Sequence, residues 1–523
     1  MAAPSDKLAE SLAVLKSIQD KGIVAIRANH LTRTHRERLL RSGFIREVMK
    51  GWYIPARPDE PAGESTAWYA SFWGFCADYF NDRFGEEWCL NAEQSLNLHT
   101  GDWTVPRQLL VRSPKGGNKP TDLLFGTSVL DVRLELPQAR DIDTKDGLRI
   151  MTLPVALISC APNQYTAHPI EMRSALAMIA DASEVLSHLL AGGHSKVAGR
   201  LAGGFRNIGR DRIADNIIEA MRTAGYTVNE SDPFKDKPSI TLGAKESSPH
   251  EIRIRMIWET MRDQVLQNFR AKPGPIRDKT SYLKQVEEIY VSDAYNSLSI
   301  EGYRVSTQLI ERVREGNWNP DSVSGDREHQ DALAARGYWQ AFQSVKQSIG
   351  KVLNGEDAGR IAEKDHSAWY RELFGPGVTA GIIKPADLAG YRSSPVYIRR
   401  SMYVPPRYAA VRELMPTFFE LLQQEKEPAV RVVLGHFVFV YIHPYVDGNG
   451  RMGRFLMNVM LASGGYRWLV IPVEKRNHYM AALESASVDQ DIAPFTKFLS
   501  DLMRKAKAER SRSEYDSVSD VSN

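Results

Sequence analysis

The pattern of hydrophobic and polar positions divides the chain into a mixed first half and a helical second half. Near the start, Leu12, Leu15 and Ile18 recur at helical spacing within residues 8–19, and a second helix is expected at residues 32–41. Two short β-prone runs follow around a turn at residues 49–51. Helix, helix and hairpin in this order predict a winged helix-turn-helix over residues 1–58.

Residues 59–228 alternate strand-like and helical stretches, which predicts a second, α+β domain. We expect strands at residues 108–111 and 128–136, and helices at residues 171–190 and 212–224. The region contains no metal-ligand spacing, no Gly-rich phosphate loop and no paired acid and base, so we assign it no chemistry. Residues 229–250 are rich in Ser, Pro, Lys and Asp and are predicted to form a linker.

Helical patterns dominate the rest of the chain and predict a mainly α-helical domain over residues 251–503. The expected helices cover residues 251–269, 281–298, 331–348, 411–425, 428–442, 451–463 and 491–504. The charged, Ser-rich tail at residues 504–523 is predicted to be disordered.

Composition narrows the class of protein. Hydrophobic residues make up 43% and charged residues 25% of the 523 residues, as in ordinary globular proteins. The three cysteines form no Cys-x-x-Cys pair and cannot supply a disulfide framework, so we expect a reducing cytoplasm. No signal-peptide pattern is present, and the apolar stretch at residues 430–442 is too short to cross a bilayer, so no membrane association is expected.

The net charge of +3 predicts no global attraction to nucleic acid, but residues 1–58 contain eleven basic and five acidic side chains. Five of the basic residues fall on the predicted recognition helix or wing: Arg33, Arg36, Arg38, Arg41 and Lys50. This placement predicts contacts to DNA phosphates and base edges. The alternative is a solvated face on a small helical cap.

The segment from His443 to Arg454, His-Pro-Tyr-Val-Asp-Gly-Asn-Gly-Arg-Met-Gly-Arg, lies between two apolar helices and predicts a phosphate-binding loop. Gly448 and Gly450 allow main-chain N–H groups to point at an anion where the second helix begins. Arg451 and Arg454 follow in the first turn of that helix, where the helix dipole disfavours cations unless a negative ligand is present.

Two further side chains of the loop carry chemistry. Asp447 offers a carboxylate oxygen of the kind that Mg²⁺ prefers when it is bound together with phosphates. His443 stands at the entrance of the loop and could take a proton from an attacking hydroxyl. The alternative is an αα-turn in which Asp, Asn and Gly merely cap helices.

Residues 251–502 closely resemble the Fic family, whose signature is His-Pro-Phe, two residues, Gly-Asn-Gly-Arg, two residues, Arg. Every position matches except that Tyr445 replaces Phe. The resemblance implies transfer of AMP from ATP to a protein hydroxyl. It implies that His443 is the general base, that Asp447 binds Mg²⁺, that Gly448, Asn449 and Gly450 hold the α-phosphate region, and that Arg451 and Arg454 hold the β- and γ-phosphates.

Two other segments resemble Fic elements. Residues 390–398, followed by residues 403–406, look like the β-hairpin flap that docks the target by strand addition, with Val396, Tyr397 and Ile398 as docking residues. The segment Ser297-Leu-Ser-Ile-Glu301-Gly302 is similar to the inhibitory motif, in which the Glu pairs with the second arginine of the loop, here Arg454. The alternative for this segment is an ordinary helix C-terminus capped by Gly302.

Residues 1–227, with Leu31 to Gly43 and Met49 to Tyr53, resemble AbiEi-type antitoxin regulators. The sequence therefore predicts a multidomain, cytoplasmic, bacterial and autoinhibited protein adenylyltransferase, with ATP as substrate, Mg²⁺ as cofactor, a protein target, and a module that contacts DNA. The competing hypothesis is a DNA-binding regulator whose Fic domain only senses nucleotide. Homodimerisation is left open.

Overall fold

The computed structural model describes residues 4–60, 63–237, 248–269, 276–318 and 329–505. The chain forms two compact units, which are described separately. The first unit contains Met1–Arg253 and Tyr397–Pro405, and the second contains Ile254–Val396 and Pro406–Asn523. The division falls inside helix α11 (Pro249–Asn268). The sequence assigned residues 397–405 to the helical domain, whereas the structure includes them in the first unit. The tail predicted to be disordered covers residues 504–523; residues 504 and 505 are helical, and residues 506–523 lie outside the described residues.

The first unit begins with two helices, three short strands and a 3₁₀ turn, in an order that agrees with the predicted helix, helix and hairpin. Thr32 caps the second helix by accepting a hydrogen bond from the His35 N–H. The strands form an antiparallel sheet in the order β1-β3-β2, and Leu15, Leu39 and Ile45 belong to the core beneath it. The elements are α1 (Pro4–Gln19), β1 (Ile26–Arg27), η1 (Ala28–His30), α2 (Arg33–Arg41), β2 (Ile45–Met49) and β3 (Trp52–Pro55). Identification of this arrangement as a winged helix-turn-helix stays a prediction.

A four-stranded sheet and an aromatic helix form the middle of the first unit. The sheet has the order β4-β5-β7-β6, with β5 and β7 parallel, and Trp68 and Phe72 of α3 belong to its core. A separate hairpin pairs β8 with β9. The elements are α3 (Thr66–Phe84), β4 (Cys89–Leu90), α4 (Ala92–His99), β5 (Gln108–Ser113), β6 (Pro120–Asp122), η2 (Leu124–Gly126), β7 (Ser128–Arg133), η3 (Ala139–Asp141), β8 (Ile142–Lys145) and β9 (Leu148–Met151).

Short helices complete the first unit, and the single helix predicted at residues 171–190 is wrong. The chain forms α7 and α8 there, bent by 106°. The Glu184 side chain accepts hydrogen bonds from the N–H groups of Ala180 and Asp181, and Asp181 Oδ1 accepts one from the Ser183 N–H. These local side-chain bonds to the backbone start a new helix. The elements are α5 (Leu153–Ser159), α6 (Gln164–Ala167), α7 (Pro169–Met178), α8 (Ser183–Gly192), α9 (Ser195–Asn207) and α10 (Asp211–Thr223).

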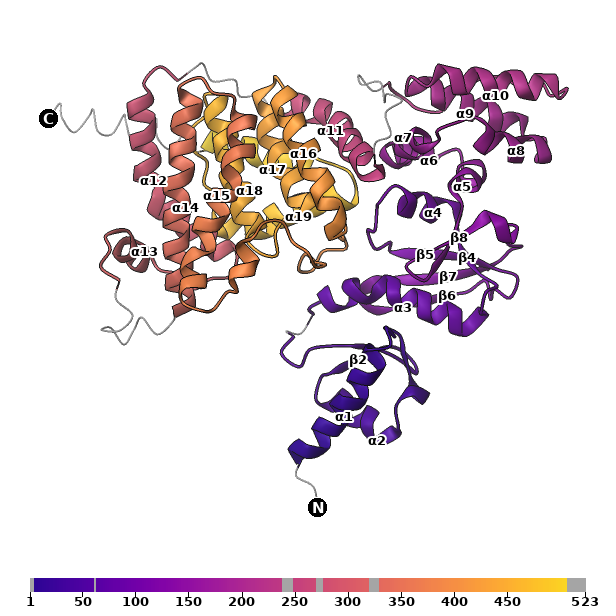
Figure 1. Cartoon of the computed structure of the whole chain (residues 1–523), viewed down its shortest axis with the longest axis horizontal. Helices are drawn as coiled ribbons and strands as arrows, with labels where there is room; N and C mark the ends of the chain where they lie inside the picture. Colours follow the sequence, from indigo (N-terminus) through magenta and orange to yellow (C-terminus); the bar gives the residue numbers. More distant parts are fainter. Residues whose placement is uncertain (1–3, 61–62, 238–247, 270–275, 319–328, 506–523) are drawn as a thin grey trace. The chain divides into compact units, whose positions relative to one another are not determined.

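The second unit is a helical bundle in which α17 and α18 pack against each other, and α18 also packs on α14 and α15 (Figure 1). Its elements are α12 (Lys279–Ile300), α13 (Thr307–Arg314), α14 (His329–Leu353), α15 (Ala358–Thr379), η5 (Pro385–Leu388), α16 (Tyr408–Gln424), α17 (Pro428–Ile442), α18 (Asn449–Ser463), η6 (Val473–Lys475) and α19 (Arg476–Val488), and residues 493–505 are also helical. Three of these helices, α13, α15 and α19, were not predicted. Among the described residues, no single helix has both the length and the apolar composition to cross a membrane; only α7 and α8 together do, as a bent pair.

The β-hairpin predicted for the flap is wrong. Residues 390–407 form bends and turns, and none of them pairs as a strand. Pro395, Pro405 and Pro406 lack the N–H that a ladder needs, so they oppose strand pairing here. The buried side chain of Arg392 instead hydrogen-bonds to carbonyl groups at both ends of this segment, Ser394 and Pro406.

Candidate active site

The phosphate-binding loop predicted from the sequence joins α17 to α18. Helix α17 is buried along most of its length and ends at His443, which adopts a left-handed conformation with φ 53°. Gly448 is also left-handed, with φ 80°, and a Cβ there would lie 2.7 Å from the Phe374 ring. Glycine is therefore required at this position, and the turn directs the N-terminus of α18 back toward the loop.

The imidazole of His443 is held in one orientation by its own helix. Its Nδ1 lies 3.0 Å from the carbonyl oxygen of Val440. Because a carbonyl can only accept, Nδ1 must carry a proton, which makes Nε2 the unprotonated nitrogen of the neutral ring. Burial lowers the pKa of His443 to about 4, although the Val440 hydrogen bond opposes the shift. His443 is therefore neutral near pH 7 and can accept a proton at Nε2.

This lowered pKa predicts the acid side of the pH profile. If His443 is the base that the sequence predicts, its neutral form is the active one, so the reaction should persist at pH 6 and fall only as the pH approaches about 4. The measurement is kcat for transfer at saturating nucleotide between pH 4 and 8. A half-loss of kcat near pH 6.5, the value of an unperturbed histidine, would contradict the assigned environment of His443.

The Asn449 side chain closes the loop. Its Oδ1 accepts from the Tyr445 N–H at 2.9 Å, and its Nδ2 donates to the Tyr445 carbonyl at 2.9 Å. The resemblance implied that Asn449 holds the α-phosphate region; in the structure both polar atoms of its side chain hydrogen-bond to Tyr445, and a contact to phosphate stays a prediction. Tyr445, in the position where the family has Phe, stacks on Tyr370 with the ring centroids 3.8 Å apart, so it retains the role of an aromatic anchor.

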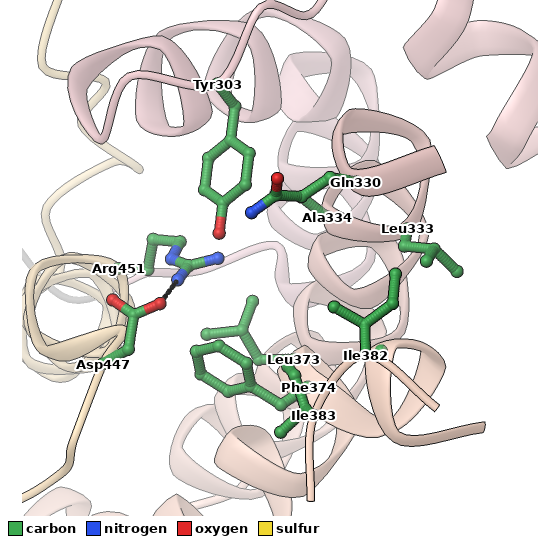
Figure 2. A pocket seen from close by; sticks show the side chains of 11 residues that line it. Tyr303, Gln330, Leu333, Ala334, Leu373, Phe374, Ile382, Ile383, Asp447 and Arg451 are labelled. Atoms are coloured by element: carbon green, nitrogen blue, oxygen red, sulfur yellow. Dashed lines mark hydrogen bonds and ion pairs between the residues drawn. The ribbon is translucent and has the colours of Figure 1, made fainter. Parts of the chain in front are cut away.

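Arg451 and Asp447 form the charged wall of a pocket that is otherwise mostly apolar (Figure 2). The Arg451 guanidinium donates to the Asp447 carboxylate at 3.2 Å and lies over the rings of Tyr303 and Phe374. Arg451 is 1% exposed, and its Nε has no hydrogen-bond partner among the described residues. The pocket is lined by Tyr303, Gln330, Leu333, Ala334, Leu373, Phe374, Gly377, Ile382, Ile383, Asp447 and Arg451.

Arg454 is buried one turn further along α18 and meets the end of α12. Its Nη2 lies 2.6 Å from Glu301 Oε1, and its Nε donates to Ser297 Oγ at 2.8 Å. Burial would raise the pKa of Glu301, but Arg454 and Arg451 outweigh it and lower this pKa. The Nη1 of Arg454 has no partner among the described residues. The contact between Glu301 and Arg454 that the resemblance implied is therefore present.

Glu301 also lies directly against the start of α18. A Cβ added at Gly450 would be 2.4 Å from Glu301 Oε1, so the carboxylate touches the backbone of the first turn. A helix N-terminus attracts negative charge, and Glu301 occupies the place where an anion would bind. Gly302, with φ 95°, ends α12 while Tyr303 donates to the Leu298 carbonyl, as in a Schellman cap. Gly302 therefore caps the helix, and Glu301 pairs with Arg454. The two interpretations of this segment, a capped helix C-terminus and a motif whose Glu binds Arg454, are compatible.

Asp447 is the acidic residue of the loop that could bind a cation. Its Oδ1 accepts from the Gly448 N–H at 2.6 Å, and its side chain is 63% exposed. Within the residues that the structure describes, no group of three or more His, Cys, Asp or Glu side chains could hold a metal ion. A metal at Asp447 would therefore have to share its coordination with a ligand and water, as Mg²⁺ commonly does.

The three predicted docking residues, Val396, Tyr397 and Ile398, follow one another in a segment without strand pairing, and their role in docking stays a prediction. Sequence reasoning missed Arg392, which is 2% exposed and donates to the His443 carbonyl at 2.7 Å. No pattern in the sequence distinguishes this arginine from the exposed arginines nearby.

The five basic residues predicted to contact DNA have different environments. The Arg36 guanidinium donates to the Ala28 carbonyl at 2.9 Å, and Arg38 donates to the Lys7 carbonyl and to Ser11 Oγ. These two side chains therefore form hydrogen bonds within the first sixty residues. The exposed members of the set are Arg33, which pairs with Glu37, together with Arg41 and Lys50.

Comparison with known proteins agrees with this geometry. Residues 363–461 match the model of the Fic/DOC family. The chain is 30% identical over 275 residues to protein adenylyltransferase Fic of Drosophila willistoni, covering 51% of each chain. It is 31% identical over 235 residues to the protein of the same name from Drosophila virilis, covering 44% of each. The chain thus spans about half the length of the curated relatives it matches, and these relatives give no support for the predicted bacterial origin.

A solved structure of Fic-1 (residues 134–508) from C. elegans is 18% identical, with a TM-score of 0.37, and covers 65% of this chain and 93% of that chain. This TM-score is too low to support a fold assignment. The family match covers α17, the loop and most of α18, and the loop carries the Fic signature with buried arginines at the expected places. We conclude that this chain carries a domain of the Fic/DOC family.

Proposed function

We propose that the chain is a protein adenylyltransferase, which transfers AMP from ATP to a hydroxyl side chain of a protein target. The observation that carries this proposal is a neutral histidine, with its Nδ1 held by Val440, one loop away from a helix N-terminus that presents buried arginines. In the reaction, the target oxygen attacks the α-phosphorus and its proton passes to His443 Nε2. The bond between the α-phosphorus and the bridging oxygen breaks, and pyrophosphate leaves. Positioning and charge neutralisation supply most of the rate acceleration.

The residues of the loop fit a triphosphate. Arg451 and Arg454 are almost fully buried, and each has an N–H group without a partner among the described residues, as expected when an anion completes the site. Main-chain N–H groups at the start of α18 add to the attraction. Asp447 would hold Mg²⁺, which when bound would neutralise phosphate charge.

We further propose that Glu301 inhibits the enzyme. Its carboxylate binds Arg454 at 2.6 Å and touches the backbone at Gly450, so it competes with the γ-phosphate for one guanidinium and one helix N-terminus. A nucleotide could then bind only in a pose that is unsuitable for transfer. An enzyme is favoured over a nucleotide sensor by the neutral histidine placed to accept a proton and by the carboxylate paired with Arg454, because a sensor requires neither.

Mass spectrometry tests the proposed reaction. Purified protein with Glu301 replaced by Gly, incubated with ATP and Mg²⁺, should gain the mass of one adenylyl group on itself or on proteins of a lysate. Peptide mapping should place the adduct on Ser, Thr or Tyr. An adduct confined to acidic or lysine side chains would contradict transfer to a hydroxyl.

DNA binding by the first sixty residues remains the second proposal, supported by the exposed positions of Arg33, Arg41 and Lys50. Replacing Arg41 and Lys50 with Ala should weaken duplex binding and reduce the slope of log affinity against log salt by roughly 1 per lost phosphate contact. The measurement is a salt titration of fluorescence anisotropy with the full chain. Should the chain show no salt-dependent affinity for any duplex, this module is better described as a protein-contact domain.

A further inference from the structure

Arg392 joins the catalytic loop to the segment that follows α15. Its guanidinium donates to the carbonyl groups of His443 and Ile442, at 2.7 and 3.5 Å, and to those of Ser394 and Pro406. Its own N–H donates to the Pro444 carbonyl at 2.9 Å. One buried side chain therefore contacts the C-terminus of α17 and the carbonyl groups of Ser394 and Pro406.

The carbonyl groups at the end of α17 need such a partner. The last carbonyls of a helix have no acceptor role within the helix and carry its negative dipole end, so a cation there is favourable. His443 is in addition a non-glycine residue with φ 53°, a strained conformation that persists only when its surroundings enforce it. The hydrogen bond from Arg392 Nε to the His443 carbonyl supplies part of that enforcement.

The conformation of His443 determines where its imidazole lies. The imidazole makes its Nδ1 contact to Val440, one turn back along α17, while the His443 backbone is in the left-handed conformation. A displacement of about 1 Å in a reacting group can cost roughly 10²-fold in rate. The guanidinium has the planar, multi-donor shape needed to reach several carbonyl groups at once, which a lysine ammonium lacks.

We propose that Arg392 is a positioning residue for the transfer reaction: it holds the backbone of His443 in the orientation that places Nε2 for proton abstraction, and it links that backbone to the carbonyl groups of Ser394 and Pro406. The inference rests on the proposed adenylyltransferase function. Arg392 touches neither reacting group itself, so its contribution should appear in kcat and leave nucleotide affinity largely unchanged.

The test uses the full chain with Glu301→Gly as parent, so that rates are measurable. Arg392→Lys keeps the charge but loses the geometry, and it should lower kcat for transfer by about 10- to 100-fold, with KM for ATP within about threefold of the parent. Arg412→Lys, an exposed arginine on α16, is the matched control and should behave as the parent. A kcat within twofold of the parent for a folded Arg392→Lys protein would overturn the proposal. A parallel loss of ATP affinity and thermal stability would also overturn it, because it would indicate a purely structural role.

A second variant gives a readout that does not depend on activity. The charged groups that act on the His443 pKa are Arg392, which lowers it, and Glu301 and Asp447, which raise it. Arg392→Gln removes the cation and loosens the ring, so the His443 pKa measured by NMR should rise toward 6.5, whereas Arg392→Lys, which keeps the cation, should raise it less. An unchanged pKa in Arg392→Gln would count against the proposal even if the parent proved inactive. An inactive parent would contradict the proposed function alone.

Discussion

His443→Ala should abolish AMP transfer while leaving ATP binding nearly intact. The substitution removes the proton acceptor, and positioned bases of this kind contribute about 10²- to 10⁴-fold in rate. It removes no phosphate contact, because the residues that we propose to bind phosphate lie on α18. The two measurements are label transfer from ATP and the Kd for ATP by calorimetry.

The matched control is His168→Ala, which removes an exposed histidine of the first unit and should leave both quantities unchanged. Undiminished labelling by His443→Ala, with ATP bound as in the parent, would remove His443 from the mechanism. Loss of ATP binding together with transfer would show that the histidine supports the loop and does not act as the base.

Glu301→Gly should raise AMP transfer by about 10²-fold. Charge-assisted hydrogen bonds of the Glu301–Arg454 type contribute roughly 1.5–3 kcal/mol, which corresponds to about 10- to 150-fold in an equilibrium between the inhibited and the productive pose. The substitution frees the Arg454 guanidinium and the start of α18 for the γ-phosphate. Self-labelling with ATP and Mg²⁺ gives the rate directly.

Two controls separate release of inhibition from damage to α12. Ser299→Gly places glycine in the same helix end, at a similar cost of about 1 kcal/mol or less, and retains the carboxylate, so its activity should stay low. Glu301→Gly combined with His443→Ala should be silent. If Glu301→Gly stayed at the parental level while folded and nucleotide-bound, the pairing with Arg454 would be structural and the proposed inhibition would be wrong.

The catalytic loop could be predicted because its reactive and charged side chains lie close together in the sequence. His443, Asp447 and the two arginines fall within twelve residues, between apolar helices whose periodicity defines the ends of the loop. Glu301 is 153 residues from Arg454, and periodicity alone does not bring them together. That pairing came from the resemblance to the family, and the structure supplies the contact.

The features that the sequence did not predict correctly have local physical causes. The bend between α7 and α8 arises from Glu184 and Asp181 capping backbone N–H groups, a competition that helical periodicity does not reveal. Arg36 and Arg38 looked like free cations, but their stems are long enough to fold back onto carbonyl groups of neighbouring elements. The role of Arg392 depends on carbonyl groups from three separate segments, which only the folded chain brings together.

The most direct test of the central claim compares ATP labelled on the α-phosphate with ATP labelled on the γ-phosphate, using the Glu301→Gly protein, Mg²⁺ and a lysate. AMP transfer leaves the α-phosphorus on the target and releases the γ-phosphorus in pyrophosphate. We therefore predict protein-bound label from α-labelled ATP, dependent on His443, and no γ-label beyond that of the lysate alone, whose own kinases transfer the γ-phosphoryl group. Protein-bound γ-label that depends on the added protein would show phosphoryl transfer, and the absence of both labels would show that the domain binds nucleotide without transferring it; either result would contradict the proposed function.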